Sequence, residues 1–311
     1  MSTAVQQVPT PFSPTSSQVA VAYSVCRSIT RSAAKNFYYA FLVLPEAKRQ
    51  ALCAVYAYMR RCDDIADDMK VPAYERRQRL EAWLDAFHRA ESGHPTDDPV
   101  LLALTDAQRR FKIPVELLDQ LAFGTSMDIQ DGDGPSASGE LQVLYQTFAD
   151  LRLYCYRVAS VVGLVCIRIF GYRDPAAEAL AENLGLAFQL TNIIRDIQED
   201  AAMGRIYLPA EDLDRFKIVP AELRQPEIPE RLRWLLAAEA DRAREYYGSA
   251  RELIQLIDED SQPALWVLVT IYRRLLEKIS DRKYDVFGKK ISLTVREKVT
   301  ILGKGLVKRL A

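Results

Sequence analysis

Apolar residues recur at three- and four-residue spacings along most of the chain from Val19 onward. That spacing places them on one face of an α-helix. The alternation of apolar and polar residues that is typical of strands rarely extends beyond four positions, and no segment repeats at a fixed period. The pattern therefore predicts an all-α protein in which roughly eight to ten helices form a single domain over residues 19–311.

Proline and glycine mark the ends of the predicted helices. The segment DGDGPSASGE, residues 131–140, is predicted to be a mobile surface loop, because its small polar side chains bury too little area to offset the entropy of ordering them. Residues 1–18 have neither the basic start nor the apolar core of a secretion signal, so we expect a disordered N-terminal tail. The other breaks lie at Pro45, 93–95, 171–175, Pro209, 220–229 and Pro263.

Charge and residue counts exclude several classes of function. The 41 Lys and Arg against 42 Asp and Glu leave a net charge of −1, so no overall field attracts nucleic acid and no nucleic-acid partner is expected. The 2 histidines are too few for a multi-histidine zinc site and leave little material for a Ser-His-Asp triad. The 5 cysteines contain no C-x-x-C pair, which indicates free thiols in a reducing cytoplasm.

The most apolar stretch is residues 158–170. It contains Arg168 and is shorter than the ~18 residues that a membrane-spanning helix needs. The sequence therefore predicts a cytoplasmic protein whose contact with a membrane is at most peripheral, at its inner face.

One predicted apolar helix ends in the acidic sequence DDIADD, residues 63–68. At about 100° per residue, Tyr56, Arg60, Asp63 and Asp67 fall on one stripe of that helix. A solvated, charged helix end is the ordinary alternative. Against it, the aspartates repel each other and lie at the C-terminal end of the helix, where the helix dipole disfavours anions. This arrangement predicts a bound cation.

A second predicted helix, within residues 182–209, also ends in carboxylates. Its apolar residues cover nearly the whole circumference, so we expect the helix to be buried. Gln189, Asn192, Asp196 and Asp200 lie on one stripe, at steps of three and four residues. An ordinary polar helix end is again the alternative. Two core helices that each end in carboxylates four residues apart favour a shared binding site.

The residue types on the two stripes indicate which chemistry they support. Paired carboxylates with few histidines favour a hard divalent ion such as Mg²⁺, which commonly bridges carboxylates to substrate phosphates. An apolar bundle interior between the two helices would hold a long hydrocarbon. The sequence therefore indicates a magnesium-dependent enzyme that acts on an apolar diphosphate. The flanking side chains suited to the phosphate oxygens are Lys35, Arg60, Arg195, Arg205 and Tyr207.

Four segments carry a resemblance to a known family: KNFYYAFLVLP (35–45), DDIAD (63–67), YCYRVASVVG (154–163) and QLTNIIRDIQEDAAMGRIYLP (189–209). At these segments the sequence resembles the squalene and phytoene synthases, which join two identical allylic diphosphates head to head. The resemblance implies an isoprenoid-synthase helical bundle with a central apolar cavity. It also implies that the two aspartate motifs face each other across the mouth of that cavity.

The resemblance further implies roles for individual residues. Tyr154 resembles the family tyrosine near the reacting carbons, and its position one turn before apolar residues predicts a ring that points into the cavity. The alternative for Tyr154 is a buried aromatic residue with a satisfied hydroxyl. Aromatic faces that would stabilise a carbocation belong to Phe37, Tyr38 and Phe188. The implied Mg²⁺ ligands are Asp63, Asp67, Asn192, Asp196 and Asp200. The implied diphosphate-binding residues are Lys35, Arg60, Gln189, Arg195, Arg205 and Tyr207.

The resemblance is compatible with two head-to-head reactions. The segments FYYAFLVLP and IFGY (169–172) look most similar to bacterial presqualene diphosphate synthases, so the main expectation is condensation of two farnesyl diphosphates to presqualene diphosphate or squalene. The alternative is condensation of two geranylgeranyl diphosphates to phytoene. No G-x-G-x-x-G follows a strand, so the sequence has no nicotinamide fingerprint. The resemblance leaves the use of NADPH open, because related enzymes bind the reductant without that motif. More remote alternatives are a terpene cyclase, a head-to-tail elongase and a non-catalytic helical assembly factor.

Overall fold

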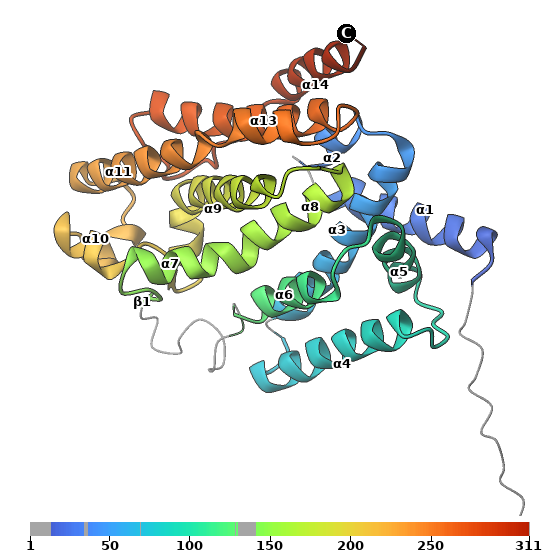
Figure 1. Ribbon diagram of the computed structural model, residues 1–311. Helices are drawn as coiled ribbons and strands as arrows, with labels where there is room; N and C mark the ends of the chain where they lie inside the picture. Colours follow the sequence, from blue (N-terminus) through green and yellow to red (C-terminus); the bar gives the residue numbers. More distant parts are fainter. Residues whose placement is uncertain (1–13, 34–36, 69, 128, 130–140, 311) are drawn as a thin grey trace, which may run out of the picture.

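The structure is a computed structural model that describes residues 14–33, 37–68, 70–127, 129 and 141–310. Most of the described chain is helical (Figure 1), which confirms the predicted all-α class. The first half forms α1 (Ser16–Ala33), α2 (Phe37–Phe41), α3 (Glu46–Ala66), α4 (Ala73–Glu91), α5 (Pro99–Phe111) and α6 (Val115–Ser126). The second half forms β1 (Gln142–Val143), α7 (Phe148–Cys155), the π-helical η1 (Tyr156–Ser160), α8 (Val161–Phe170), α9 (Ala176–Ala202), β2 (Arg205–Ile206), α10 (Ala210–Arg215), the 3₁₀-helical η2 (Pro220–Arg224), α11 (Glu230–Tyr247), α12 (Ala250–Leu256), α13 (Gln262–Asp281) and α14 (Val295–Leu310).

The described residues contain 14 α-helices, more than the sequence pattern predicts. Three of them, α2, α10 and α12, have 5, 6 and 7 residues. Such helices are too short to show a helical period in the sequence. In addition, η1 joins α7 and α8 into one continuous run, so the longer helical runs agree with the predicted number.

Two groups of helices meet in the middle of the molecule (Figure 1). In the first group, α1, α3 and α5 pack against each other, and α4 and α6 pack against α3. In the second group, α9 contacts α8, η1, α11 and α12, and α13 packs on α9 and α11. Contacts of α3 and α6 with α8 join the groups. The arrangement leaves α3 and α9 facing each other across the centre.

Helix α9 is buried around most of its middle, as the sequence predicts. Leu184, Leu186, Ala187 and Leu190 are all buried although they point in different directions around the helix. A Cβ atom added to Gly185 would lie 2.6 Å from the Cα of Ser160, so this glycine lets α9 approach the π-helical segment closely. The close approach fixes the distance between α9 and the run that contains η1.

The run Phe148–Phe170 is long and apolar enough, by length and composition alone, to cross a membrane. This helical run is longer than the apolar stretch 158–170 noted in the sequence, because α7, η1 and α8 are continuous. Half of its most apolar window is buried inside the molecule, as in the core helix of a folded bundle. Several of its residues also line the cavity described below, so packing and the cavity account for its apolar character.

The N-terminal boundary differs slightly from the prediction. Helix α1 begins at Ser16, within the segment predicted to be a tail. The backbone N–H of Thr15 donates to Gln18 Oε1 at 2.9 Å, and the backbone N–H of Gln18 donates to Thr15 Oγ1 at 3.3 Å, so this pair caps the helix. Residues 1–13 and the loop 131–140 lie outside the described residues. All five cysteines are free, as expected.

Candidate active site

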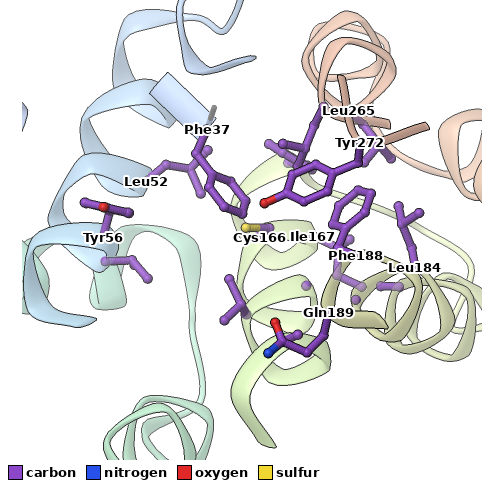
Figure 2. A pocket seen from close by; sticks show the side chains of 18 of the residues that line it. Phe37, Leu52, Tyr56, Cys166, Ile167, Leu184, Phe188, Gln189, Leu265 and Tyr272 are labelled. Atoms are coloured by element: carbon purple, nitrogen blue, oxygen red, sulfur yellow. The ribbon is translucent and has the colours of Figure 1, made fainter. Parts of the chain in front are cut away.

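A cavity of about 180 Å³ lies between α3 and α9, at the junction of the two helix groups (Figure 2). Its walls are almost entirely apolar, which confirms the expected central apolar cavity. Side chains reach it from α2, α3, η1, α8, α9, α12 and α13. The residues that line it include Phe37, Leu52, Tyr56, Val158, Cys166, Ile167, Leu184, Phe188, Gln189, Leu265 and Tyr272.

Three aromatic rings narrow the interior. The rings of Phe188 and Tyr272 stack with centroids 4.3 Å apart, and the centroid of Phe37 lies 6.0 Å from that of Tyr272. The Tyr272 hydroxyl points into the cavity, toward Phe37 and Cys166 (Figure 2). Phe37 and Phe188 were expected to offer aromatic faces, whereas Tyr38 is absent from the lining and Tyr272 was missed.

The two acidic stripes follow directly from the cavity walls. Leu52 and Tyr56 of α3 line one wall of the cavity, and Phe188 and Gln189 of α9 line another (Figure 2). The aspartates come next along each helix, at 63–67 on α3 and at 196–200 on α9. Each acidic motif therefore follows a stretch of helix that lines the cavity, and the expectation that the two motifs face each other across its mouth stays a prediction.

Gln189 and Asn192 both line the cavity where α9 approaches its acidic end. The Asn192 Nδ2 donates to Gln189 Oε1 at 3.4 Å. The other amide atom, Asn192 Oδ1, is buried and accepts no hydrogen bond from any residue that the structure describes. A buried amide oxygen without a partner is costly, and here it is aligned with Asp196 and Asp200.

Asp196 is held by two cationic side chains. Arg195 donates to it through both Nε, at 2.7 Å, and Nη2, and Lys290 Nζ lies 2.9 Å from Asp196 Oδ1. Burial works to raise the pKa of Asp196, but the hydrogen bonds and charges of Arg195 and Lys290 outweigh it and lower the pKa below its usual range. Lys290 also pairs with Glu199 and comes from the segment between α13 and α14. Sequence reasoning missed Lys290.

Asp200 lies one turn further along α9, in a different electrostatic environment. Burial raises the pKa of Asp200 to about 7, and the charge of Asp196 adds to this rise. The nearby Arg205 opposes the rise, so the predicted diphosphate-binding residue on β2 lies close to the acidic stripe. A carboxylate that is costly to ionise next to another carboxylate is typical of a cation-binding site.

The acidic end of α3 is more exposed. Arg60 pairs with Asp64 across one helical turn at 2.6 Å, and both side chains are about half exposed. The backbone N–H of Asp67 donates to the Asp63 carbonyl at 2.8 Å and ends α3 there. The structure thus positions Asp63 and Asp67 at the helix end, where the sequence places them. Lys35, the remaining predicted diphosphate-binding residue, lies outside the described residues.

Tyr154 does not line the cavity, contrary to the predicted orientation of its ring. Its ring is buried and stacks on Tyr207, with centroids 5.2 Å apart, and lies 5.4 Å from the ring of Tyr145. The reason is that β1 and β2 pair in parallel, with Gln142 opposite Arg205, and bring these tyrosines together. Tyr154 therefore belongs to a tyrosine cluster beside Arg205.

The donor atoms on α9 fit a hard cation, because the unpartnered amide oxygen of Asn192 shares a stripe with two carboxylates. Among the residues that the structure describes, no three carboxylate, imidazole or thiolate side chains lie together closely enough to hold a metal ion alone. An ion such as Mg²⁺ would therefore need waters and phosphate oxygens to complete its coordination. Bound there, Mg²⁺ would supply positive charge for a diphosphate.

The helical bundle, its apolar cavity and the two helices that end in carboxylates are those of an all-α prenyltransferase of the isoprenoid-synthase fold. The model of the squalene/phytoene synthase family matches residues 30–297, and the chain belongs to that family. The chain is therefore an enzyme of the squalene/phytoene synthase type, and the reaction of this family is head-to-head prenyl condensation.

Individual relatives refine the comparison. The chain is 37% identical over 300 residues to a 15-cis-phytoene synthase from Synechococcus elongatus, with 92% of each chain covered. It is 38% identical over 295 residues to a phytoene synthase from Mycobacterium tuberculosis, with 93% of this chain and 92% of the relative covered. A crystal structure of a dehydrosqualene synthase in complex with a ligand superposes with a TM-score of 0.81 at 31% identity, covering 93% of this chain and 96% of that chain.

Proposed function

We propose that the protein condenses two molecules of geranylgeranyl diphosphate, head to head, into phytoene. One observation carries the choice of product: relatives that are 33–38% identical across more than 90% of this chain are phytoene synthases. They favour the alternative that the sequence left open over condensation of two farnesyl diphosphates. The family also implies a prenyl diphosphate substrate and a typical dependence on Mg²⁺.

The geometry suits this reaction. The prenyl chain would lie in the apolar cavity, and the diphosphate would lie at the end of the cavity where Asp196, Arg195 and Arg205 gather. Cationic side chains stabilise the departing diphosphate, and the rings of Phe37 and Phe188 face the allylic cation that is left behind. The apolar walls keep water away from this cation.

The bond changes of phytoene formation balance without a reductant. The double bond of one substrate attacks the allylic carbon of the other as the first diphosphate leaves, and loss of a proton closes a cyclopropane ring. The second diphosphate then leaves, the ring opens, and a second proton is lost to give the central double bond. No hydride enters, so this proposal predicts turnover without NADPH. Formation of squalene would require a hydride donor.

The cavity must widen when substrate binds. Its volume of about 180 Å³ is smaller than the ~300–1,000 Å³ that is typical of ligand pockets. The stacked Phe188 and Tyr272 rings fill part of the interior, so we expect them to separate as the prenyl chains enter. Substrate binding should therefore change the near-ultraviolet circular dichroism of the aromatic residues.

A second candidate is condensation of two farnesyl diphosphates. The likeness to a dehydrosqualene synthase, at 31% identity and a TM-score of 0.81, supports it. Incubation of the purified protein with each diphosphate separately, in Mg²⁺ and with or without NADPH, distinguishes the two. We expect a higher kcat/KM for geranylgeranyl diphosphate and no effect of NADPH. A higher kcat/KM for farnesyl diphosphate would support the second candidate, and a cyclic monomer or a head-to-tail product would contradict both.

A further inference from the structure

Helix α14 lies on the outside of the bundle and packs on α13 (Figure 1). Its inward face is well packed: Ile301 is buried, and a Cβ atom added to Gly305 would lie 2.4 Å from a methyl group of Val267 on α13. The helix is thus a firmly attached part of the fold. Its outward face is therefore a rigid surface.

The outward face of α14 is apolar. Val295, Val299, Leu306 and Val307 are exposed by 67%, 52%, 41% and 66%. At about 100° per residue, Val295, Val299 and Leu306 lie within roughly 40° of one another and form a continuous stripe. Single exposed apolar residues are ordinary, but a stripe on a helix that also buries its other face is typical of a docking surface.

The charge of this helix indicates what docks there. Its sequence, VREKVTILGKGLVKRL, contains 5 basic residues and 1 acidic residue. The acidic residue, Glu297, is already paired with Lys278 at 2.9 Å. Arg296 is exposed between the apolar stripe and Val307, and Lys304 is exposed about 60° beyond Val307, on the side away from the stripe. Lys298 is buried, and Lys289 is exposed in the segment that precedes the helix. A second copy of this basic surface would be repelled, whereas an anionic lipid surface is complementary to it.

We propose that α14 docks the protein on an anionic lipid bilayer, with the apolar stripe among the acyl chains and the basic residues at the headgroups. A basic helix with one apolar face lies in the membrane interface in this way. Val295, Val299 and Leu306 supply the apolar contact, and Arg296 and Lys304 supply the charge.

Docking through α14 would bring the cavity close to the membrane. α14 contacts α2, and Lys298 Nζ lies 5.6 Å from the centroid of the Tyr39 ring on that helix. The same short helix carries Phe37 and Phe41, which line the cavity. A docked α14 therefore brings one cavity wall close to the bilayer. This consequence rests on the proposed function, in which the product is an apolar hydrocarbon. Such a product would leave the cavity close to the lipid bilayer, in which it dissolves.

Sedimentation with lipid vesicles tests the docking without any substrate. The full-length protein should sediment with vesicles that contain phosphatidylglycerol, should stay in solution with pure phosphatidylcholine, and should be released by high salt. Val299→Ser combined with Leu306→Ser should reduce binding by about tenfold, because two apolar side chains leave the lipid. Arg296→Gln combined with Lys304→Gln should weaken binding and reduce its salt dependence.

Val219→Ser is the matched control, because Val219 is equally exposed but lies between α10 and η2. It should bind like the wild type. Thermal melts of all variants should be unchanged, since the substituted side chains are exposed. Absence of binding to anionic vesicles overturns the proposal, as does binding that the α14 variants leave intact. A dimer in solution that the same α14 variants disrupt also overturns it, in favour of a second copy. None of these results depends on which prenyl diphosphate is the substrate.

Discussion

Asp196 and Asp200 lie one turn apart on α9, yet their pKa values move in opposite directions. Arg195 and Lys290 hold Asp196 as a carboxylate and lower its pKa. Asp200 is buried beside that carboxylate, and its pKa rises to about 7. In the metal-free protein, one aspartate of the stripe thus stabilises the fold and the other opposes it.

The pH dependence of stability should reveal this difference. Below pH ~4, Asp200 is protonated in both the folded and the unfolded chain. Between pH ~4 and ~7, Asp200 ionises in the unfolded chain only. The free energy of unfolding therefore falls as the pH rises through this range. Asp200→Asn removes this penalty. At pH 8 without divalent cations, it should raise the free energy of unfolding by about 2 kcal/mol, discounted for the solvent that the side chain retains. The gain should vanish near pH 4.

Asp196→Asn is the control for that experiment. It leaves Arg195 and Lys290 without their carboxylate, so at pH 8 it should lower the melting temperature. Both variants should lose turnover if Asp196 and Asp200 bind the metal. Stabilisation by both substitutions, or by neither, would contradict the opposite pKa shifts.

A second test at the residue scale concerns the hydroxyl group of Tyr154. The ring stacks on Tyr207, beside Arg205, so a catalytic hydroxyl would act on the diphosphate side of the cavity. Tyr154→Phe keeps the stacked ring and should reduce kcat by about tenfold or more, with little change in KM or melting temperature. Unchanged kcat and product would assign Tyr154 a structural role only.

Several residues of the site could be predicted from the sequence because they lie on the same helical stripes as their neighbours. Gln189, Asn192, Asp196 and Asp200 share one face of α9 through helical periodicity alone. Lys290 could not be found in this way, since it reaches Asp196 from a segment 94 residues away in sequence that lies outside any helix. The predicted orientation of the Tyr154 ring was wrong because the ring packs where β1 pairs with β2. Strands of two residues are too short to leave an alternating pattern in the sequence.

At the scale of elements, a buried ionic network holds α10 and α11 together. Arg242 pairs with Glu239 at 2.6 Å and with Asp212 at 3.1 Å, and its guanidinium lies 4.0 Å from the centroid of the Phe148 ring on α7. Both carboxylates are buried. Because α10 directly follows the segment with Arg205 and Tyr207, the network also supports the edge of the active site.

Arg242→Ala should therefore destabilise the protein strongly. It leaves two buried carboxylates without their shared cation, which costs about 3–5 kcal/mol in comparable cases. Arg274→Ala is the control, because Arg274 is partly exposed and pairs with the exposed Glu277 at 3.0 Å, with longer contacts to Asp281 and Glu297. Its loss should cost less than ~1 kcal/mol. Denaturant midpoints of both variants provide the comparison. Equal midpoints would show that the network contributes no more than a surface ion pair.

The long helices could be predicted because their apolar faces are periodic. The bounds of α9 were less well predicted, since it begins six residues before the start and ends seven residues before the end of the expected segment 182–209. The π-helical turn of η1 could not be predicted, since its residues, YRVAS, have the spacing of an ordinary helix. The π-helical turn lies at a tertiary contact, where Gly185 lets the backbone of α9 approach Ser160 closely and Ser160 Oγ donates to the Glu182 carbonyl at 2.7 Å. Such a contact is invisible to local periodicity.

At the scale of the whole molecule, the proposed site draws on both helix groups. α3 contributes one acidic motif, α9 contributes the other, and the described residues provide no complete three-residue set for a metal ion. A metal ion would therefore bind well only together with a diphosphate that supplies the missing oxygens.

Thermal melts should show this cooperation. Mg²⁺ with pyrophosphate is expected to raise the melting temperature by more than the sum of the shifts that either produces alone, because each completes the binding site of the other. Asp196→Asn should abolish the excess. Simple additivity in the wild-type protein would contradict a metal ion that bridges protein and diphosphate.

The most direct test of the proposed reaction is the identity of the product that forms when equal amounts of farnesyl and geranylgeranyl diphosphate compete for the purified protein in Mg²⁺ without NADPH. Mass spectrometry and the ultraviolet absorption of the extracted hydrocarbon identify it. The proposal predicts phytoene, with the triene that two proton losses create at the junction. Presqualene diphosphate or dehydrosqualene as the main product would contradict it.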